Sequence, residues 1–127
     1  MNPYVFPLLK KRTQQQIALT YNPQSTIATI IHIVCDVMQT DWQTINTRSR
    51  KKELVMPRHA VAYFLKWYSK LSLEKIGYLF EGGRHHSSII HSCQVWQDMI
   101  ETDKDYAKKH IEIEKNIKFK LYYLINI

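Results

Sequence analysis

The strongest constraint on the fold of this chain is the run from Leu71 to Cys93, which has the pattern of two helices joined by a tight turn. Leu73, Ile76 and Phe80 recur at helical spacing and give the first helix one apolar stripe. Gly82 and Gly83 then supply the backbone freedom needed to leave that helix and turn sharply. The second helix has an apolar stripe of its own, formed by Ile89, Cys93, Trp96 and Ile100.

The second helix opens on the polar string Arg84, His85, His86, Ser87 and Ser88. Ser87 or Ser88, together with His86, can serve the unpaired N–H groups of a helix start. Two helices joined by a glycine turn form a helix-turn-helix, whose second helix enters the major groove of DNA. A plain helical hairpin has the same spacing. The cation, the two imidazoles and the two hydroxyls at the leading end favour the DNA interpretation, because packing alone does not need them.

The charge balance indicates a polyanionic partner. The chain has 127 residues and a net charge of +7, which favours nucleic acid ahead of an anionic membrane surface. Cys35 and Cys93 fall on apolar helix faces and are predicted to be free buried thiols, as in a reducing cytoplasm. No apolar run is long enough to span a bilayer and no leader pattern is evident, so we expect a cytoplasmic protein that does not enter the membrane.

The chain divides into an N-terminal arm, residues 1–24, and one helical domain, residues 25–127. Ser25 is predicted to cap the first helix of the domain, which runs to about Gln39. Pro57 is predicted to lie in the first turn of the next long helix, where its missing N–H costs nothing. After the helix-turn-helix, Thr102 and Asp103 are predicted to break the chain and cap an additional C-terminal helix.

A basic segment from Asn46 to Glu53 separates the first two long helices. It contains Arg48, Arg50, Lys51 and Lys52, and we expect it to form a loop that contacts phosphates or the minor groove. Arg58 and Lys66 are expected on the basic side of the helix that follows. Charge runs are usually solvated faces, but this one precedes a candidate DNA-reading hairpin in a basic domain.

With these residues in view, the chain resembles domain IV of the bacterial replication initiator DnaA, the DNA-binding domain of that family. The family string is close to K-I-G-x-x-F-G-G-R-D-H-T-T-V-I-H-A, and residues Lys75 to Ser92 follow it nearly throughout. Residues Arg50 to Tyr63 are similar to the family's basic loop and following helix. The resemblance covers about Ile30 to Met99 and implies a small all-α fold of the Trp-repressor-like type.

The resemblance also implies roles for individual residues. His86, Ser87 and Ser88 match positions that face the major groove, and Arg50 matches the arginine that enters the minor groove. The positions expected at or near phosphates are Arg58, Lys66 and Arg84. Two departures bear on specificity: His85 stands where the family has an aspartate, and Glu81 is an extra residue before the glycine pair.

We therefore expect a sequence-specific double-stranded DNA-binding module that acts in replication initiation or its regulation. The chain contains no G-x-x-x-x-G-K-[ST] phosphate loop, so we expect no nucleotide, no cofactor and no ATPase activity, and a free-standing copy of the module. One alternative is a protein-interaction adaptor or transcriptional regulator that reuses the fold. Another is a metal-dependent enzyme built on His85, His86, His91 and Cys93, which the helical spacing of these residues disfavours.

Overall fold

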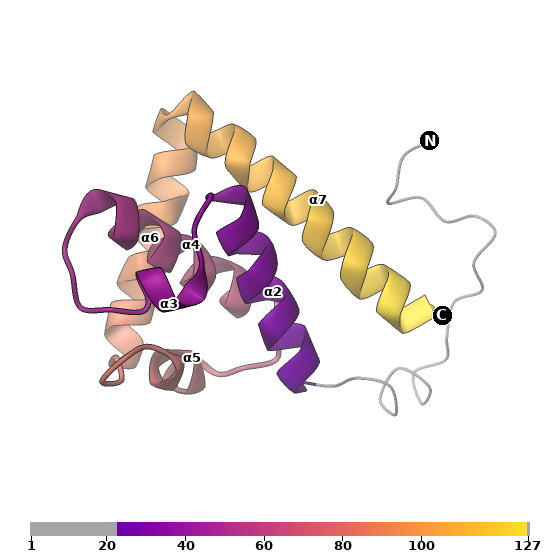
Figure 1. The fold of residues 1–127 in the computed structure, drawn as a ribbon, viewed down its shortest axis with the longest axis horizontal. Coiled ribbons are helices and arrows are strands. Elements are labelled where there is room, and N and C mark those ends of the chain that lie inside the picture. The colour runs from indigo at the N-terminus through magenta and orange to yellow at the C-terminus, as the bar shows by residue number, and fades with distance from the viewer. Residues whose placement is uncertain (1–22, 127) are drawn as a thin grey trace.

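The computed structural model describes residues 23–126, and the side chains of residues 25–121. Over this range every regular element is a helix, which confirms the all-α prediction (Figure 1). The predicted arm lies outside the described residues except for Pro23 and Gln24, which belong to the first helix. The helices are α2 (Pro23–Val37), α3 (Trp42–Ile45), α4 (Lys52–Tyr68), α5 (Leu73–Leu79), α6 (His86–Thr102) and α7 (Lys104–Asn126).

The core is built around α4, which packs against α2 and α6. The side chains of Val61, Phe64 and Leu65 are fully buried there. Trp96 of α6 and Ile76 of α5 close the core from the side of the helix-turn-helix. Burying these apolar side chains supplies the main force that holds the short helices together, since isolated helices of this length are marginal in water.

Two predicted helix starts are wrong. Ser25 is not an N-cap, because α2 already begins at Pro23, where the ring fits a helix start. Pro57 is not in the first turn of its helix, because α4 begins at Lys52 and includes it. The sequence carried a sign of the earlier start in Glu53, whose negative charge is favourable in the first turn. Pro57 therefore removes one helical hydrogen bond, the one its N–H would have donated to residue 53.

The helix-turn-helix of α5 and α6 is present as predicted, and its turn depends on glycine at three positions. Gly82 and Gly83 have φ of 75° and 72°, which side-chain-bearing residues rarely adopt. The N–H of Gly83 donates to the carbonyl of Phe80 (2.8 Å), and the N–H of Arg84 donates to that of Gly77 (2.9 Å). A Cβ at Gly77 would overlap the carbonyl oxygen of Arg84, so this close approach of the turn to α5 requires glycine.

The predicted C-terminal helix is also present, and Asp103 caps it by accepting from the N–H groups of Asp105 (2.9 Å) and Tyr106 (3.2 Å). From the corner after α6, α7 runs back along α2 (Figure 1). Its buried side contributes Ile113 and Ile117 to the core.

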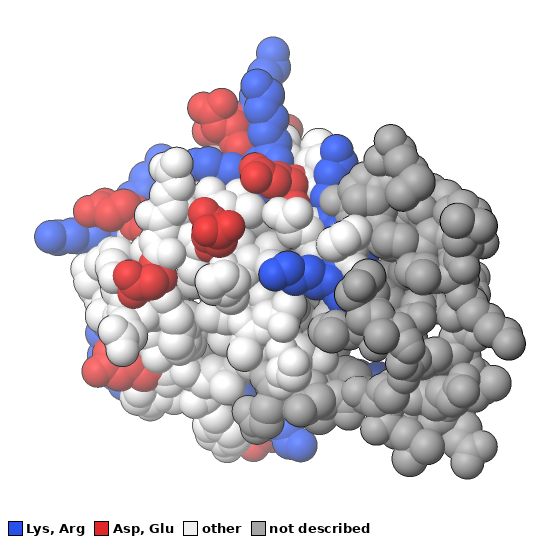
Figure 2. Space-filling model, turned by 45° about the vertical axis from the view of Figure 1, so that its right-hand side comes forward, with Lys and Arg blue, Asp and Glu red and all other residues white. Residues whose placement is uncertain are grey.

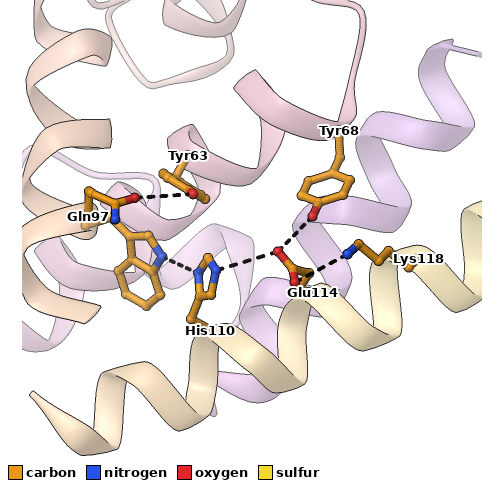
Figure 3. Close-up of polar contacts among 7 residues, drawn as sticks. Tyr63, Tyr68, Gln97, His110, Glu114 and Lys118 are labelled. Atoms are coloured by element: carbon orange, nitrogen blue, oxygen red, sulfur yellow. Dashed lines mark hydrogen bonds and ion pairs between the residues drawn. The ribbon is translucent and has the colours of Figure 1, made fainter. Parts of the chain in front are cut away.

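A network of polar contacts joins α7 to α4 and α6 (Figure 3). The indole N–H of Trp96 donates to Nδ1 of His110 (3.1 Å), whose Nε2 lies 3.7 Å from a Glu114 carboxylate oxygen. The hydroxyl of Tyr68 donates to the same carboxylate (2.9 Å). These contacts join α4, α6 and α7, so the helix after the helix-turn-helix is part of the same packed unit.

Candidate nucleic-acid interface

A cleft of about 560 Å³ lies where the basic loop (residues 46–51), α4, the turn before α6 and α6 itself meet. We call it the cationic cleft. Its charged and titratable lining comprises four arginines, two histidines and a single carboxylate: Arg48, Arg50, Arg58, Arg84, His59, His91 and Glu81. The remaining lining residues are Ser49, Val55, Phe80, Gly83 and Ser92. A concave surface with so many cations around one carboxylate attracts anions.

Positive charge is not gathered in this way over the whole surface. On the face shown in Figure 2, Lys and Arg side chains are interspersed with Asp and Glu. The cationic cleft is therefore a local concentration of positive charge, in contrast to the mixed charges on the face that Figure 2 shows.

Arg58 is a buried residue in the lining of the cleft. It was expected on the basic side of α4, opposite the buried side, and that placement is wrong, because the residue is only 6% exposed. Its Nη1 donates to the carbonyls of Ile45 (3.0 Å) and Thr47 (2.7 Å), and its Nη2 donates to that of Ser49. Burial, and after it the nearby Arg84, lowers the pKa of Arg58. The guanidinium therefore holds the backbone of the basic loop.

The basic loop carries the exposed cations Arg48, Arg50 and Lys51, and Lys52 follows as the first residue of α4. The loop contacts the helix-turn-helix directly. Oδ1 of Asn46 accepts a hydrogen bond from the N–H of Glu81 (2.7 Å), the residue that is extra relative to the family string. The guanidinium of Arg48 lies against Gly82, where a Cβ would collide with it. The extra residue thus ties the turn to the basic loop.

The cleft contains two histidines: His59 was not singled out from the sequence, and His91 was considered there only as part of a metal-dependent enzyme. His59 of α4 and His91 of α6 meet edge to face, with ring centroids 6.4 Å apart. Burial, and after it the charges of His91, Arg58 and Arg84, lowers the pKa of His59 to about 4, so this ring is neutral at pH 7. Nδ1 of His59 and Nε of Arg84 are buried and have no hydrogen-bond partner among the described residues. In the sequence His59 stands out only by its position directly after Arg58, and nothing there links it to His91.

The start of α6 is exposed, and an imidazole caps it. Nδ1 of His85 accepts a hydrogen bond from the N–H of Ser87 (3.2 Å) and lies 2.8 Å from Oγ of Ser87. The expectation that Ser87 or Ser88 with His86 would cap the helix is therefore wrong. His86, Ser87 and Ser88 are instead exposed on the first turn, and Ile90 one turn later is 47% exposed.

The structure gathers most, but not all, of the predicted site residues. Arg48, Arg50, Arg58 and Arg84 meet in the cationic cleft, and residues 85–88 form the adjoining end of α6. Lys66 is exposed two turns further along α4, with its Nζ 5.1 Å from the ring centroid of Trp67, and does not line the cleft.

The described part of the chain bears on three further points from the sequence: metal binding, the cysteines and the membrane. In that part, no group of three or more His, Cys, Asp or Glu side chains could hold a metal ion. Cys35 and Cys93 are buried and free. None of the described helices is both long enough and apolar enough to cross a membrane.

Comparison with known proteins gives one consistent result. The family described as bacterial dnaA protein helix-turn-helix matches residues 27–95, from α2 into α6. The chromosomal replication initiator protein DnaA of Bacteroides thetaiotaomicron is 35% identical over 95 residues, which are 75% of this chain and 20% of the relative. Those of Flavobacterium psychrophilum and Chlorobaculum tepidum are 28% and 32% identical over 86% and 85% of this chain, and 23% and 22% of the relatives. The chain thus spans about a fifth of the length of these relatives. No solved structure matches it.

Proposed function

Because the chain belongs to the bacterial DnaA helix-turn-helix family, we propose that it binds double-stranded DNA at specific sequences, in replication initiation or its regulation. The observation that carries the proposal is the position of the exposed, polar start of α6 beside a cleft lined by four arginines. A helix end that can contact bases and a cationic surface that can hold phosphates are the two parts that specific DNA binding needs.

In this proposal α6 enters the major groove by its first turn. The major groove admits one α-helix, and side chains at the leading end of the helix meet the base edges. His86, Ser87 and Ile90 are all exposed and lie one helical turn or less apart. Ser87 has a group that can hydrogen-bond to a base edge, and Ile90 can contact the methyl group of thymine.

The basic loop binds the adjacent minor groove, and the cationic cleft faces the phosphates between the two grooves. Arg50 is exposed on a loop whose backbone is held by Arg58, so its guanidinium is presented from a fixed support. Arginine is favoured where A·T pairs narrow the minor groove and strengthen its negative potential. Arg58 has a positioning role here, whereas Arg48 and Arg84 supply charge.

Selection of bound sequences from a random pool of duplexes tests the proposal. We expect a preferred site, a preference for duplex over single strands, and an affinity that falls steeply with salt. Arg50→Ala should relax selection where A·T pairs are preferred, and Ser87→Ala should relax it at one or two major-groove positions by about 1–3 kcal/mol each. Lys66→Ala should weaken all sequences about equally.

A matched control is Lys115→Ala, which removes the same charge from the exposed side of α7. It should lower affinity less than Lys66→Ala does. Tighter binding to single strands, or no selected sequence at all, would contradict the proposal. Selected sites that occur at promoters and not near a replication origin would assign the protein to transcriptional regulation.

A further inference from the structure

The first turn of α6 is capped by a side chain whose hydrogen-bonding direction is fixed by the cap itself. His85 has extended backbone angles (φ −65°, ψ 150°), and its Nδ1 accepts the N–H of Ser87. A ring nitrogen that accepts a hydrogen bond carries no proton. The proton of the neutral ring is therefore on Nε2. A cationic ring has protons on both nitrogens and cannot make this cap.

The same constraint extends to the hydroxyl of Ser87. Its Oγ lies 2.8 Å from Nδ1 of His85, a hydrogen-bond distance. In the tautomer that makes the cap, Nδ1 has one lone pair and no proton, so the hydroxyl is the donor and shares that lone pair with the N–H of Ser87. The hydroxyl proton is thus engaged within the protein, and the oxygen has only its two lone pairs to offer a ligand.

We propose that His85 and Ser87 contact DNA as a linked pair with fixed hydrogen-bonding roles, His85 as the donor and Ser87 as the acceptor. This inference rests on the proposed function of α6. Nε2–H of His85 donates to a keto base, at O6 of guanine or O4 of thymine. Oγ of Ser87 accepts from an amino base, at N6 of adenine or N4 of cytosine. Both side chains are exposed at the leading end of the helix, where such contacts form.

An aspartate at position 85 would have the opposite hydrogen-bonding role. It can cap the helix with one oxygen, but it can only accept from a base, which suits an amino group. Asparagine can cap through its oxygen and still donate through its amide nitrogen. His85→Asp and His85→Asn are thus a matched pair that keeps the cap and differs in the group offered to the base.

The hydrogen-bonding role of His85 can be measured without DNA. Long-range ¹H–¹⁵N correlation spectra at neutral pH distinguish a protonated from an unprotonated ring nitrogen, and they should show His85 with the proton on Nε2. His86, whose ring is adjacent (centroids 4.0 Å apart) but takes no part in the cap, is the internal comparison. A proton on Nδ1 of His85, or an even mixture of both forms, would overturn the proposal.

Sequence selection tests the contacts themselves. We expect wild type and His85→Asn to select guanine or thymine at one position. His85→Asp should prefer adenine or cytosine there, and the ratio of affinities for the two kinds of base should change by about 5- to 150-fold. Ser87→Ala should relax selection of an amino base at a neighbouring position. Identical selected sites for wild type and His85→Asp would overturn the proposal while the proposed function stands. A wild-type protein that selects no sequence would overturn the proposed function, whatever the tautomer.

Discussion

Replacing Arg58 tests whether this side chain holds the basic loop in place or contacts phosphate. Arg58→Met keeps much of the length of the side chain and removes the guanidinium. The carbonyls of Ile45, Thr47 and Ser49 then lose their donor. Hydrogen bonds to a charged group contribute about 1.5–3 kcal/mol each. The carbonyls of Thr47 and Ser49 are only partly buried and can recover water, whereas that of Ile45 is buried, so we expect a loss of about 3–4 kcal/mol in the free energy of unfolding, not the full sum.

The assays are urea unfolding and amide hydrogen exchange of the basic loop, each compared with Arg50→Met. Arg50 is exposed, so its replacement should change the free energy of unfolding by no more than about 0.5 kcal/mol while it weakens DNA binding. Arg58→Lys is the sharper variant. Lysine can replace an arginine that only contacts phosphate. It cannot reproduce the planar guanidinium that donates hydrogen bonds to three carbonyls. If Arg58→Lys matched wild type in stability and in loop exchange, the positioning role of Arg58 would be refuted.

Other substitutions test the turn, the cleft and the α7 network. Gly77→Ala should destabilise by about 1–3 kcal/mol in thermal or urea unfolding, because its Cβ overlaps the Arg84 carbonyl; a gain in stability, as helix propensity alone predicts, would show that the turn can move away. His59 has a pKa lowered from 6.5 to about 4, so the unfolded chain binds more protons and stability is lost as pH falls from about 6.5 toward 4. His59→Gln should remove up to about 3 kcal/mol of that loss, measured by unfolding at pH 7.5 and 4.5; an unchanged pH dependence would show that His59 is not the group responsible. Tyr68→Phe should cost about 1 kcal/mol through its hydrogen bond to Glu114, measured by the same unfolding; no loss would mean that this bond does not help to hold α7.

The helix-turn-helix was predictable because its determinants are local. Gly82 and Gly83 lie next to each other between two apolar stripes, and the structure places both at positive φ. The helix starts at Pro23 and Lys52 were missed for a different reason. Ser25 and Pro57 are the start signals that the sequence suggests, whereas α2 begins at Pro23, whose ring fits a helix start, and α4 includes Pro57 in its interior.

The interior of the cleft could not be predicted, because it depends on contacts between distant segments. Nothing in the neighbourhood of Arg58 indicates that its partners are backbone carbonyls of residues 45–49. The pairing of His59 with His91 likewise arises only when α4 packs against α6. The cap by His85 was missed because Ser, Thr, Asp and Asn are the usual caps, and the string offered two serines close by.

The central claim is that the start of α6 and the basic loop bind duplex DNA together. A titration of ¹⁵N-labelled protein with the selected duplex, followed by amide chemical shifts, tests it most directly. We predict that the largest shifts fall in residues 46–52 and 84–91, and that the exposed side of α7 around Lys115 changes little. Shifts concentrated on α7 or on α2, with residues 84–91 unchanged at saturation, would contradict the claim.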